Sequence, residues 1–282
     1  MESHLTPALI AAIIGAGALH ACWNAIAKQV TDRLMAFAWI AVASMAVGGA
    51  VLAVTGLPAR QAVPYAITSA IIHVGYDVGL MSSYRLGAFN QTYPIARGTS
   101  PLVVAVGAYF LANEHLGAAA LVGIATLAAG LMCLALSAGR LTRRDLPAVG
   151  AAVLTGLTIA AYTVTDGIGV RHAHDSWAYT ALLFVLMGPP VLVAAAIRRP
   201  LTAWRDGASI RRGTVAGLLS TAAYGIVLFA QTRAPLAEVA AIRETSVVFA
   251  ALIGVAVLGE DFGRRRVVAA VVIAAGIVLI GL

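Results

Sequence analysis

The chain has 282 residues, of which 61% are hydrophobic and only 11% are charged. Soluble domains carry about 25% charged residues, so this composition excludes a globular domain with a water-soluble surface. Apolar runs of about 20 residues, the length that crosses a bilayer core of about 30 Å, recur from one end of the chain to the other. The sequence therefore predicts a multi-pass membrane protein. We interpret the first run as a span and not as a signal peptide, because further spans follow it.

The formal net charge of +7 comes mostly from short connections between the apolar runs. Basic residues in such positions contact lipid headgroups, so we expect a lipid bilayer and no nucleic acid as a partner. Cys22 and Cys133 lie in separate apolar runs and predict neither a disulfide nor a metal pair. His172, His174 and Asp175 form a loop cluster that is weak as a metal motif. We therefore predict no cofactor and no metal site.

Hydropathy predicts ten spans. Their expected bounds are 5–28, 34–57, 62–84, 90–112, 117–137, 147–167, 177–197, 212–232, 236–258 and 264–282. Each half of the chain holds five spans, an odd number, so a second copy of the unit enters the membrane in the opposite sense. We expect an all-α membrane protein of ten transmembrane helices. They would form two inverted five-helix repeats, residues 1–138 and 147–282, around a central cavity.

The repeat is clearest around two arginines. Arg97-Gly-Thr-Ser in the fourth predicted span returns as Arg243-Glu-Thr-Ser in the ninth. A glutamate follows seventeen positions after each arginine, Glu114 in the first copy and Glu260 in the second. We interpret both glutamates as turn and pairing residues at span ends. At 1.5 Å per residue, each arginine lies roughly 10 Å inside its span, and the inverted repeats bring the two toward the midplane from opposite faces.

Two prolines, Pro94 and Pro101, flank Arg97 inside the fourth span. A proline within a helix frees a carbonyl group and kinks the chain. Broken helices beside a midplane site are the means by which alternating-access transporters hold small polar ligands. The pattern therefore predicts a bent or broken fourth helix at the site.

Polar and aromatic side chains inside the spans fall at helical spacings of three and four residues, so they form stripes on single helix faces. A charged group at membrane depth costs at least ~2.5–3.5 kcal/mol on insertion scales, so it normally faces a cavity or a partner. We expect these stripes to line one polar cavity that binds substrate. The candidate substrate-binding residues are His20, Trp23, Asn24, Tyr76, Asp77, Tyr93, Arg97, Tyr162, Tyr224, Arg243 and Glu244.

The two arginines keep two interpretations open. In the first they contact the substrate directly. In the second they form structural ion pairs, Arg97 with Asp77 and Arg243 with Glu244 or Asp166. His20 and His73 are likewise either hydrogen-bonded core residues or proton relays. Proton or ion coupling is therefore left open, as is the oligomeric state.

Loop charge predicts an orientation. Connections after odd-numbered spans hold 14 lysines and arginines, against 3 after even-numbered spans. The positive-inside rule then places the odd connections in the cytoplasm and both termini outside.

Three kinds of stretch carry a family resemblance. They are LHACWNAIAK at 19–28, YPIARG at 93–98, and the glutamate that closes each repeat, Glu114 and the last residue of LGE at 258–260. Together with the ten-span layout, they resemble the EamA-type members of the drug/metabolite transporter superfamily over essentially the whole chain. The resemblance implies a bacterial inner (plasma) membrane permease with its site in a central cavity, and it implies both termini inside. His20 occupies the region where small multidrug exporters carry a carboxylate, which disfavours proton-coupled efflux of lipophilic cations.

These patterns predict a secondary transporter, not an enzyme, that moves a small anionic or zwitterionic organic metabolite by alternating access. Guanidinium groups bind carboxylate, phosphonate or sulfonate in a bidentate manner, which is why an anion is expected. One alternative is a drug or metabolite efflux pump of broad specificity. Another is a membrane-embedded lipid-modifying enzyme, but neither a His-Glu-x-x-His pair nor a Gly-x-Ser-x-Gly elbow occurs.

Overall fold

The computed structural model describes residues 5–86, 89–137, 142–258 and 264–281, and every regular element in these ranges is helical. Three 3-10 turns, Arg60–Ala62, Arg143–Asp145 and Ala203–Arg205, accompany the α-helices. The α-helices are α1 (Pro7–Lys28), α2 (Arg33–Thr55), α3 (Val63–Leu86), α4 (Phe89–Leu111), α5 (Ala118–Ser137), α6 (Leu146–Arg171), α7 (Ser176–Arg198), α8 (Gly207–Gln231), α9 (Leu236–Arg243), α10 (Thr245–Leu258) and α11 (Arg264–Ile280).

Seven of the described helices, namely α1, α2 and α4 to α8, are long and apolar enough to cross a membrane. The predicted all-helical membrane class is confirmed. The ninth predicted span, 236–258, corresponds to two helices, α9 and α10, and α8 begins at Gly207, five residues before the predicted start. The count of ten spans and the inverted repeat remain predictions.

Short polar side chains fix where several helices begin. The hydroxyl of Thr6 accepts a hydrogen bond from the backbone N–H of Leu9 at 3.2 Å and caps α1. Asp32 caps α2, Asp175 caps α7 and Asp206 caps α8 in the same way. Such caps satisfy backbone donors that the first helical turn leaves unpaired, so the apolar stretches start at defined positions.

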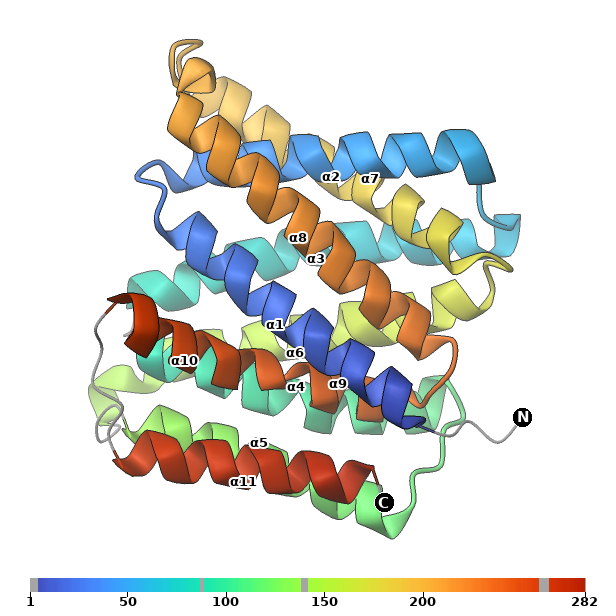
Figure 1. Ribbon diagram of the computed structural model, residues 1–282, viewed down its shortest axis with the longest axis vertical. Coiled ribbons are helices and arrows are strands. Elements are labelled where there is room, and N and C mark those ends of the chain that lie inside the picture. Colours follow the sequence, from blue (N-terminus) through green and yellow to red (C-terminus); the bar gives the residue numbers. More distant parts are fainter. Residues whose placement is uncertain (1–4, 87–88, 138–141, 259–263, 282) are drawn as a thin grey trace.

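The helices run across the view in Figure 1, and both ends of the chain lie on the same side of the molecule. α2 packs against α7 and α8, α1 packs against α8, and α3 and α4 both pack on α6. α5 and α11 lie side by side at the lower edge. There a Cβ atom on Gly123 would lie 2.7 Å from the backbone oxygen of Gly276. Small residues therefore let these two helices approach closely, as is common in membranes.

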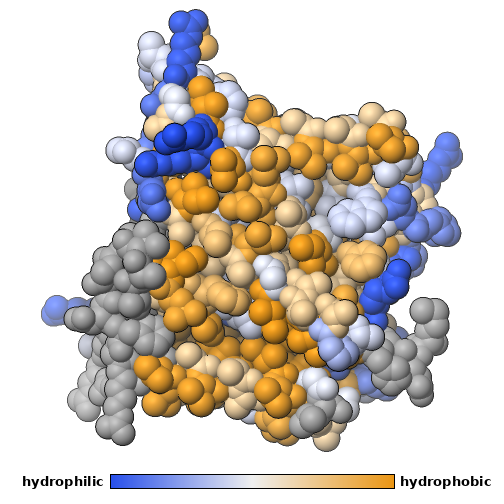
Figure 2. All heavy atoms as spheres, in the orientation of Figure 1, coloured by the Kyte–Doolittle hydropathy of each residue, from blue (hydrophilic) through white to orange (hydrophobic). Residues whose placement is uncertain are grey.

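The face shown in Figure 2 is apolar across its middle, and hydrophilic side chains gather toward its left and right edges. Large exposed apolar side chains occur on several helices, among them Ile71, Phe110, Val193 and Ile197. A soluble protein rarely exposes an apolar surface of this extent. The distribution is that of a protein surrounded by lipid.

The main core is built from apolar side chains of α1, α4, α5, α6, α8, α9, α10 and α11, and every residue of α9 except Glu238 is buried. Within it α4 is helical from Phe89 to Leu111 through both Pro94 and Pro101. The break falls instead between α9 and α10, at Glu244. A full break of the fourth span is therefore not observed, and the interruption beside the site lies in the second half of the chain. The bend expected at the two prolines remains a prediction.

Candidate functional site

Three charged side chains meet in the core. Arg97 Nε lies 2.5 Å from Glu244 Oε2, and Arg243 Nη2 lies 3.9 Å from Glu244 Oε1. The exposed fractions are 3% for Arg97, 4% for Arg243 and 0% for Glu244. The angles of these contacts do not meet those of a hydrogen bond, so charge attraction holds the group together. We call Arg97, Arg243 and Glu244 the ion triad.

The ion triad decides between the ion pairs expected from the sequence. Arg243 pairs with Glu244, as one of the alternatives held. Arg97 pairs with Glu244, so its expected pairing with Asp77 is wrong. Glu244 reaches both arginines because the helix break places it between them. Two guanidiniums share one carboxylate, which leaves the triad with a formal charge of +1.

Hydrogen bonding at the two arginines differs. Arg97 Nη2 donates to the hydroxyl of Ser246 at 2.8 Å, across the two halves of the chain. Nε and Nη2 of Arg243 and the hydroxyl of Ser100 have no hydrogen-bond partner within the described ranges. An unpaired buried donor on a charged group costs free energy, so such groups are candidates for a ligand contact.

Two glycines allow helices to cross the arginine segments closely. A Cβ atom on Gly17 of α1 would lie 2.5 Å from the hydroxyl oxygen of Thr245. A Cβ atom on Gly156 of α6 would lie 2.7 Å from the backbone oxygen of Ala96 and 2.8 Å from Cβ of Thr99. Thr99 and Thr245 are equivalent positions of the repeated motif. Each arginine segment is thus crossed by the first helix of the other half.

An aromatic group lies next to the ion triad. The Arg97 guanidinium lies 5.8 Å from the ring centre of Tyr93 on the same helix. Tyr162 stacks on His73 with ring centres 4.0 Å apart, and its ring lies 5.7 Å from that of Tyr76 and 6.3 Å from that of Tyr224. The structure therefore brings three of the predicted tyrosines, Tyr76, Tyr162 and Tyr224, together with His73, and it places the fourth, Tyr93, beside Arg97.

Asp166 on α6 lies at the far side of this aromatic group and is fully buried. It accepts hydrogen bonds from the hydroxyls of Tyr179 at 2.9 Å and Tyr224 at 2.5 Å. The alternative in which Asp166 pairs with Arg243 is therefore wrong. The tyrosine at position 179 was not among the residues expected from the sequence. It lies in the first turn of α7, thirteen positions after Asp166 and on the next helix.

The predicted residues of α1 form a smaller cluster. Trp23 Nε1 donates to His20 Nδ1 at 3.3 Å, and Asn24 Nδ2 donates to the backbone oxygen of His20 at 2.8 Å. His20 interacts electrostatically with both arginines, which places this cluster near the ion triad. Asp77 on α3 is partly buried. Its side chain has no ion pair with any residue that the structure describes.

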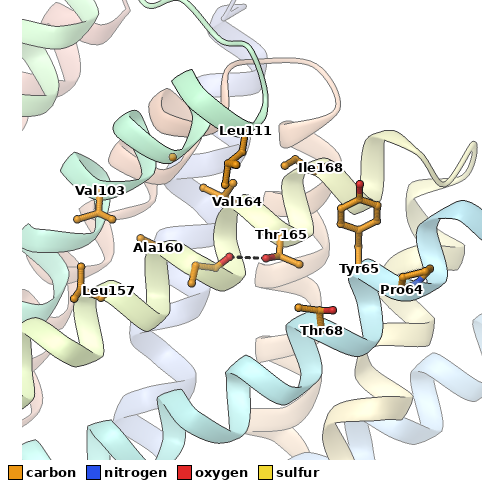
Figure 3. A pocket seen from close by; sticks show the side chains of 12 residues that line it. Pro64, Tyr65, Thr68, Val103, Leu111, Leu157, Ala160, Val164, Thr165 and Ile168 are labelled. Atoms are coloured by element: carbon orange, nitrogen blue, oxygen red, sulfur yellow. Dashed lines mark hydrogen bonds between the residues drawn. The ribbon is translucent and has the colours of Figure 1, made fainter.

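The cavity in Figure 3 lies elsewhere. It has a volume of about 620 Å³ and lies between α3, α4 and α6, with α6 contributing side chains such as Leu157 and Val164. Its polar side chains are Tyr65, Thr68 and Thr165, and it includes none of the eleven predicted substrate-binding residues. The cavity is thus mainly apolar, and it is separate from the predicted residues.

Glu114 ties the start of α9 to the rest of the protein. Both of its carboxylate oxygens accept from the backbone N–H of Leu236, at 2.8 and 3.1 Å. Arg171 lies 2.7 Å from the same carboxylate and also donates to the backbone oxygens of Gln231 and Ala234. The interpretation of Glu114 as a turn and pairing residue is confirmed. Its counterpart Glu260 lies outside the described residues.

The loop cluster between α6 and α7 has structural contacts. His172 stacks on Tyr65 with ring centres 5.5 Å apart, and Asp175 caps α7 through the backbone N–H of Trp177 at 2.8 Å. Within the described ranges, no group of three or more His, Cys, Asp or Glu side chains gathers as a metal site would require.

The model of the EamA-like transporter family matches residues 146–282. These residues, just under half of the chain, are similar to that family, and we refer to them as the EamA-like domain. For this half of the chain the match agrees with the family resemblance stated from the sequence. The EamA-like domain contains Arg243, Glu244 and Asp166, whereas Arg97 comes from the half that precedes it.

No curated protein matches this chain at a significant level. A solved structure described as "Crystal structure of protein" is similar with a TM-score of 0.81 and 18% sequence identity, over 98% of this chain and 98% of that chain. At this identity the similarity concerns the fold. It extends over both halves of the chain, beyond the EamA-like domain.

Proposed function

We propose that the protein is a secondary transporter that moves a small anionic or zwitterionic organic metabolite across a bacterial inner membrane by alternating access. The observation that carries this proposal is the ion triad. Its two guanidiniums share one carboxylate, and Arg243 keeps buried donors without a hydrogen-bond partner. A carboxylate, phosphonate or sulfonate group would balance the remaining charge and accept from those donors.

The contacts between helices support two repeats, residues 1–138 and 147–282. In the predicted repeat, α6 is the counterpart of α1 and α8 is the counterpart of α3. The contact between α3 and α6 therefore has an equivalent in the contact between α8 and α1, and both contacts are present. The same exchange turns the crossing of Gly17 over Thr245 into that of Gly156 over Thr99. This symmetry fits an inverted repeat, in which two halves rock around a shared site.

Loop charge supports an orientation with the arginine-rich connections in the cytoplasm and both termini outside. Both ends of the chain lie on one side of the molecule in Figure 1, as an even number of spans requires. Reaction of a cysteine introduced into the loop before α9 with a membrane-impermeant reagent, on intact cells, tests this orientation. We expect labelling on intact cells. Labelling only after the cells are opened would show that this loop is cytoplasmic and would reverse the proposed orientation.

The proposed substrate class can be tested by thermal unfolding of the purified protein in detergent. The panel should contain carboxylates, phosphonates, sulfonates, amino acids and lipophilic cations. A ligand at one hundred times its dissociation constant stabilises the folded state by about 2.7 kcal/mol. We expect an anionic or zwitterionic compound to stabilise the protein to this extent. Arg243→Gln should lose this stabilisation because it removes the guanidinium donors. The variant should still fold, because Arg97 continues to neutralise Glu244.

Arg233→Gln is the matched control, since Arg233 is exposed and its guanidinium lies over the ring of Phe229. It should keep the full response. Hits should then be tested for uptake or efflux in proteoliposomes. If Arg97→Gln and Arg243→Gln both retain wild-type ligand affinity and transport, the arginines do not form the site.

A second candidate function is efflux of apolar compounds with broad specificity. The mainly apolar cavity of about 620 Å³ between α3, α4 and α6 favours it. This function predicts stabilisation by lipophilic compounds that is indifferent to Arg243→Gln but weakened by Ala160→Phe, which would fill the cavity. The same panel thus separates the two functions.

A further inference from the structure

The core holds two fully buried carboxylates with different surroundings. Glu244 lies between two arginines, so its negative charge is neutralised by cations. Asp166 has no ion pair with any lysine, arginine or histidine that the structure describes, and its contacts are hydroxyl groups. Removing an unpaired charge from water costs far more than removing a paired one. Of these two groups, Asp166 is the one for which uptake of a proton removes a buried net charge.

The groups around Asp166 come from every side. α7 contributes Tyr179 and α8 contributes Tyr224, both as hydrogen-bond donors. α3 contributes Ser69, whose hydroxyl lies 3.2 Å from Nδ1 of His73. α9 contributes Arg243, which acts on Asp166 electrostatically without forming an ion pair. α4, which also packs on α6, contributes no charged contact to Asp166 within the described ranges.

A shell of hydroxyl groups suits both protonation states of a carboxyl group. An ionised carboxylate only accepts hydrogen bonds, whereas a protonated one also donates one. A tyrosine or serine hydroxyl rotates to donate in the first state and to accept in the second. A guanidinium cannot accept at all, so a carboxylate held by arginine, such as Glu244, has no comparable partner for its proton.

Asp166 is also close to one end of its helix. It lies five residues before the end of α6, about 7.5 Å along the helix axis. In the other direction, the ring of Tyr224 lies 6.1 Å from that of His73 and 6.3 Å from that of Tyr162, next to the ion triad. The carboxyl group therefore lies between one end of the bundle and the proposed substrate site.

We propose that Asp166 is a proton-binding site that couples proton movement to transport, an inference that rests on the proposed function. The step adds one proton to one carboxylate oxygen and changes no other bond. An ionised Asp166 attracts Arg243 and repels a nearby anion, whereas a neutral one does neither. Binding of an anion and binding of a proton therefore favour each other, because coupling between two sites is reciprocal. The direction of coupling is co-transport of proton and anion.

The test measures proton binding itself and needs no substrate. Infrared spectra of the purified full chain in detergent are recorded between about pH 4 and pH 9, the range in which perturbed carboxyl groups titrate. We expect the carbonyl band of a protonated, buried carboxyl group to appear on acidification. The band is assigned by difference, because Asp77 and Glu238 are further carboxyl groups that are partly buried. One component of the band should be lost in Asp166→Asn and retained in Asp77→Asn and in Glu238→Gln.

Tyr224→Phe keeps the test decisive if Asp166→Asn does not fold. It removes one hydroxyl that donates to the ionised carboxylate, so the midpoint of the same band should move to higher pH. Three results would overturn the proposal: a band of undiminished intensity in Asp166→Asn, an Asp166 component that follows sodium concentration at constant pH, or no band at any pH. A failure of the proposed transport function would leave the infrared titration unchanged.

Discussion

The two arginine segments repeat one motif, but they differ in backbone and in pairing. α4 carries Arg97 and two prolines and stays helical throughout. The equivalent segment, with Arg243 and no proline, breaks into α9 and α10. At the break, Glu244 N–H donates to the oxygen of Ala241 at 3.0 Å, a tighter turn than that of an α-helix. The break thus coincides with the buried glutamate and not with proline.

A single difference between the copies accounts for this arrangement. Arg-Gly-Thr-Ser in the first half becomes Arg-Glu-Thr-Ser in the second, so Glu244 stands where the first half has Gly98. A glutamate there supplies one carboxylate to both arginines, one from each half. The charge of the arginine in the first half is therefore neutralised by a carboxylate of the second half. Neither half on its own contains the ion triad.

The largest loss of stability is expected for Glu244→Gln, which leaves two buried guanidiniums without a counter-charge. Removing one partner of a buried ion pair costs about 3–5 kcal/mol, so we expect a large fall in the thermal unfolding temperature in detergent. Glu238→Gln, on the short helix α9 that ends just before Glu244, is the control and should have little effect, because Glu238 has no ion pair to a described residue. Equal melting temperatures for Glu244→Gln and the wild type would show that the triad does not contribute to stability.

A second test compares the two helix crossings. Gly156→Ala places a methyl group against the backbone of α4, which cannot move aside, so we expect a cost of about 3 kcal/mol. Gly17→Ala meets the side chain of Thr245, which can rotate, so we expect about 1 kcal/mol. The controls are Gly15→Ala and Gly150→Ala, which lie on the same two helices with no atom within 4 Å of the added carbon. Thermal unfolding of the four variants checks the order, and a larger effect at Gly17 than at Gly156 would contradict it.

A third test uses the serines of the motif. Ser246→Ala removes the acceptor of a buried Arg97 donor and should cost about 2 kcal/mol, as expected for a hydrogen bond to a charged group. Ser100→Ala removes a hydroxyl without a partner in the described structure and should cost nothing measurable. The difference in unfolding temperature between the two variants measures the asymmetry of the two halves. Equal losses would mean that both hydroxyls are bonded.

Much of the fold followed from the sequence because hydropathy and helix length are local properties. The predicted bounds of α1, α2 and α5 agree with the structure within two residues. The break at Glu244 did not follow, because proline is the usual local signal for a kink. Here the residue at the break, Glu244, forms an ion pair with Arg97, which lies 147 positions earlier in the chain. No local pattern contains a contact over that separation.

The candidate site shows the same limit. The repeated motif identified both arginines, and the adjacency of Arg243 and Glu244 suggested their pairing. Asp77 and Asp166 were equally reasonable partners by spacing alone, and only the packing of helices excludes them. Tyr179 and Gly156 were missed for a related reason. A tyrosine at a helix start and a glycine in an Ala-rich helix are both common, so neither stands out before its neighbours are known.

The smallest expected effect concerns the contact between the halves at the rim of the molecule. Arg199 Nε donates to Asp32 Oδ2 at 2.5 Å, and both side chains are about one-third exposed. This hydrogen bond, helped by the backbone N–H groups of Met35 and Leu34, holds the pKa of the Asp32 carboxyl below its ordinary value. A lowered pKa in the folded state stabilises the fold above the unfolded value of about 3.9, and the contribution is lost as the pH falls through the lowered pKa.

Asp32→Asn keeps an oxygen to cap α2 but removes the charge that pairs with Arg199. We expect it to unfold at a slightly lower temperature than the wild type at pH 7, by less than Gly17→Ala or Ser246→Ala, because solvent screens exposed pairs. The gap should close below about pH 3.9, where the wild-type carboxyl also becomes protonated. Arg199→Gln should show the same closure, since it removes the other partner. A gap that stays constant from neutral to acidic pH would assign the effect to the cap of α2 and not to the ion pair with Arg199.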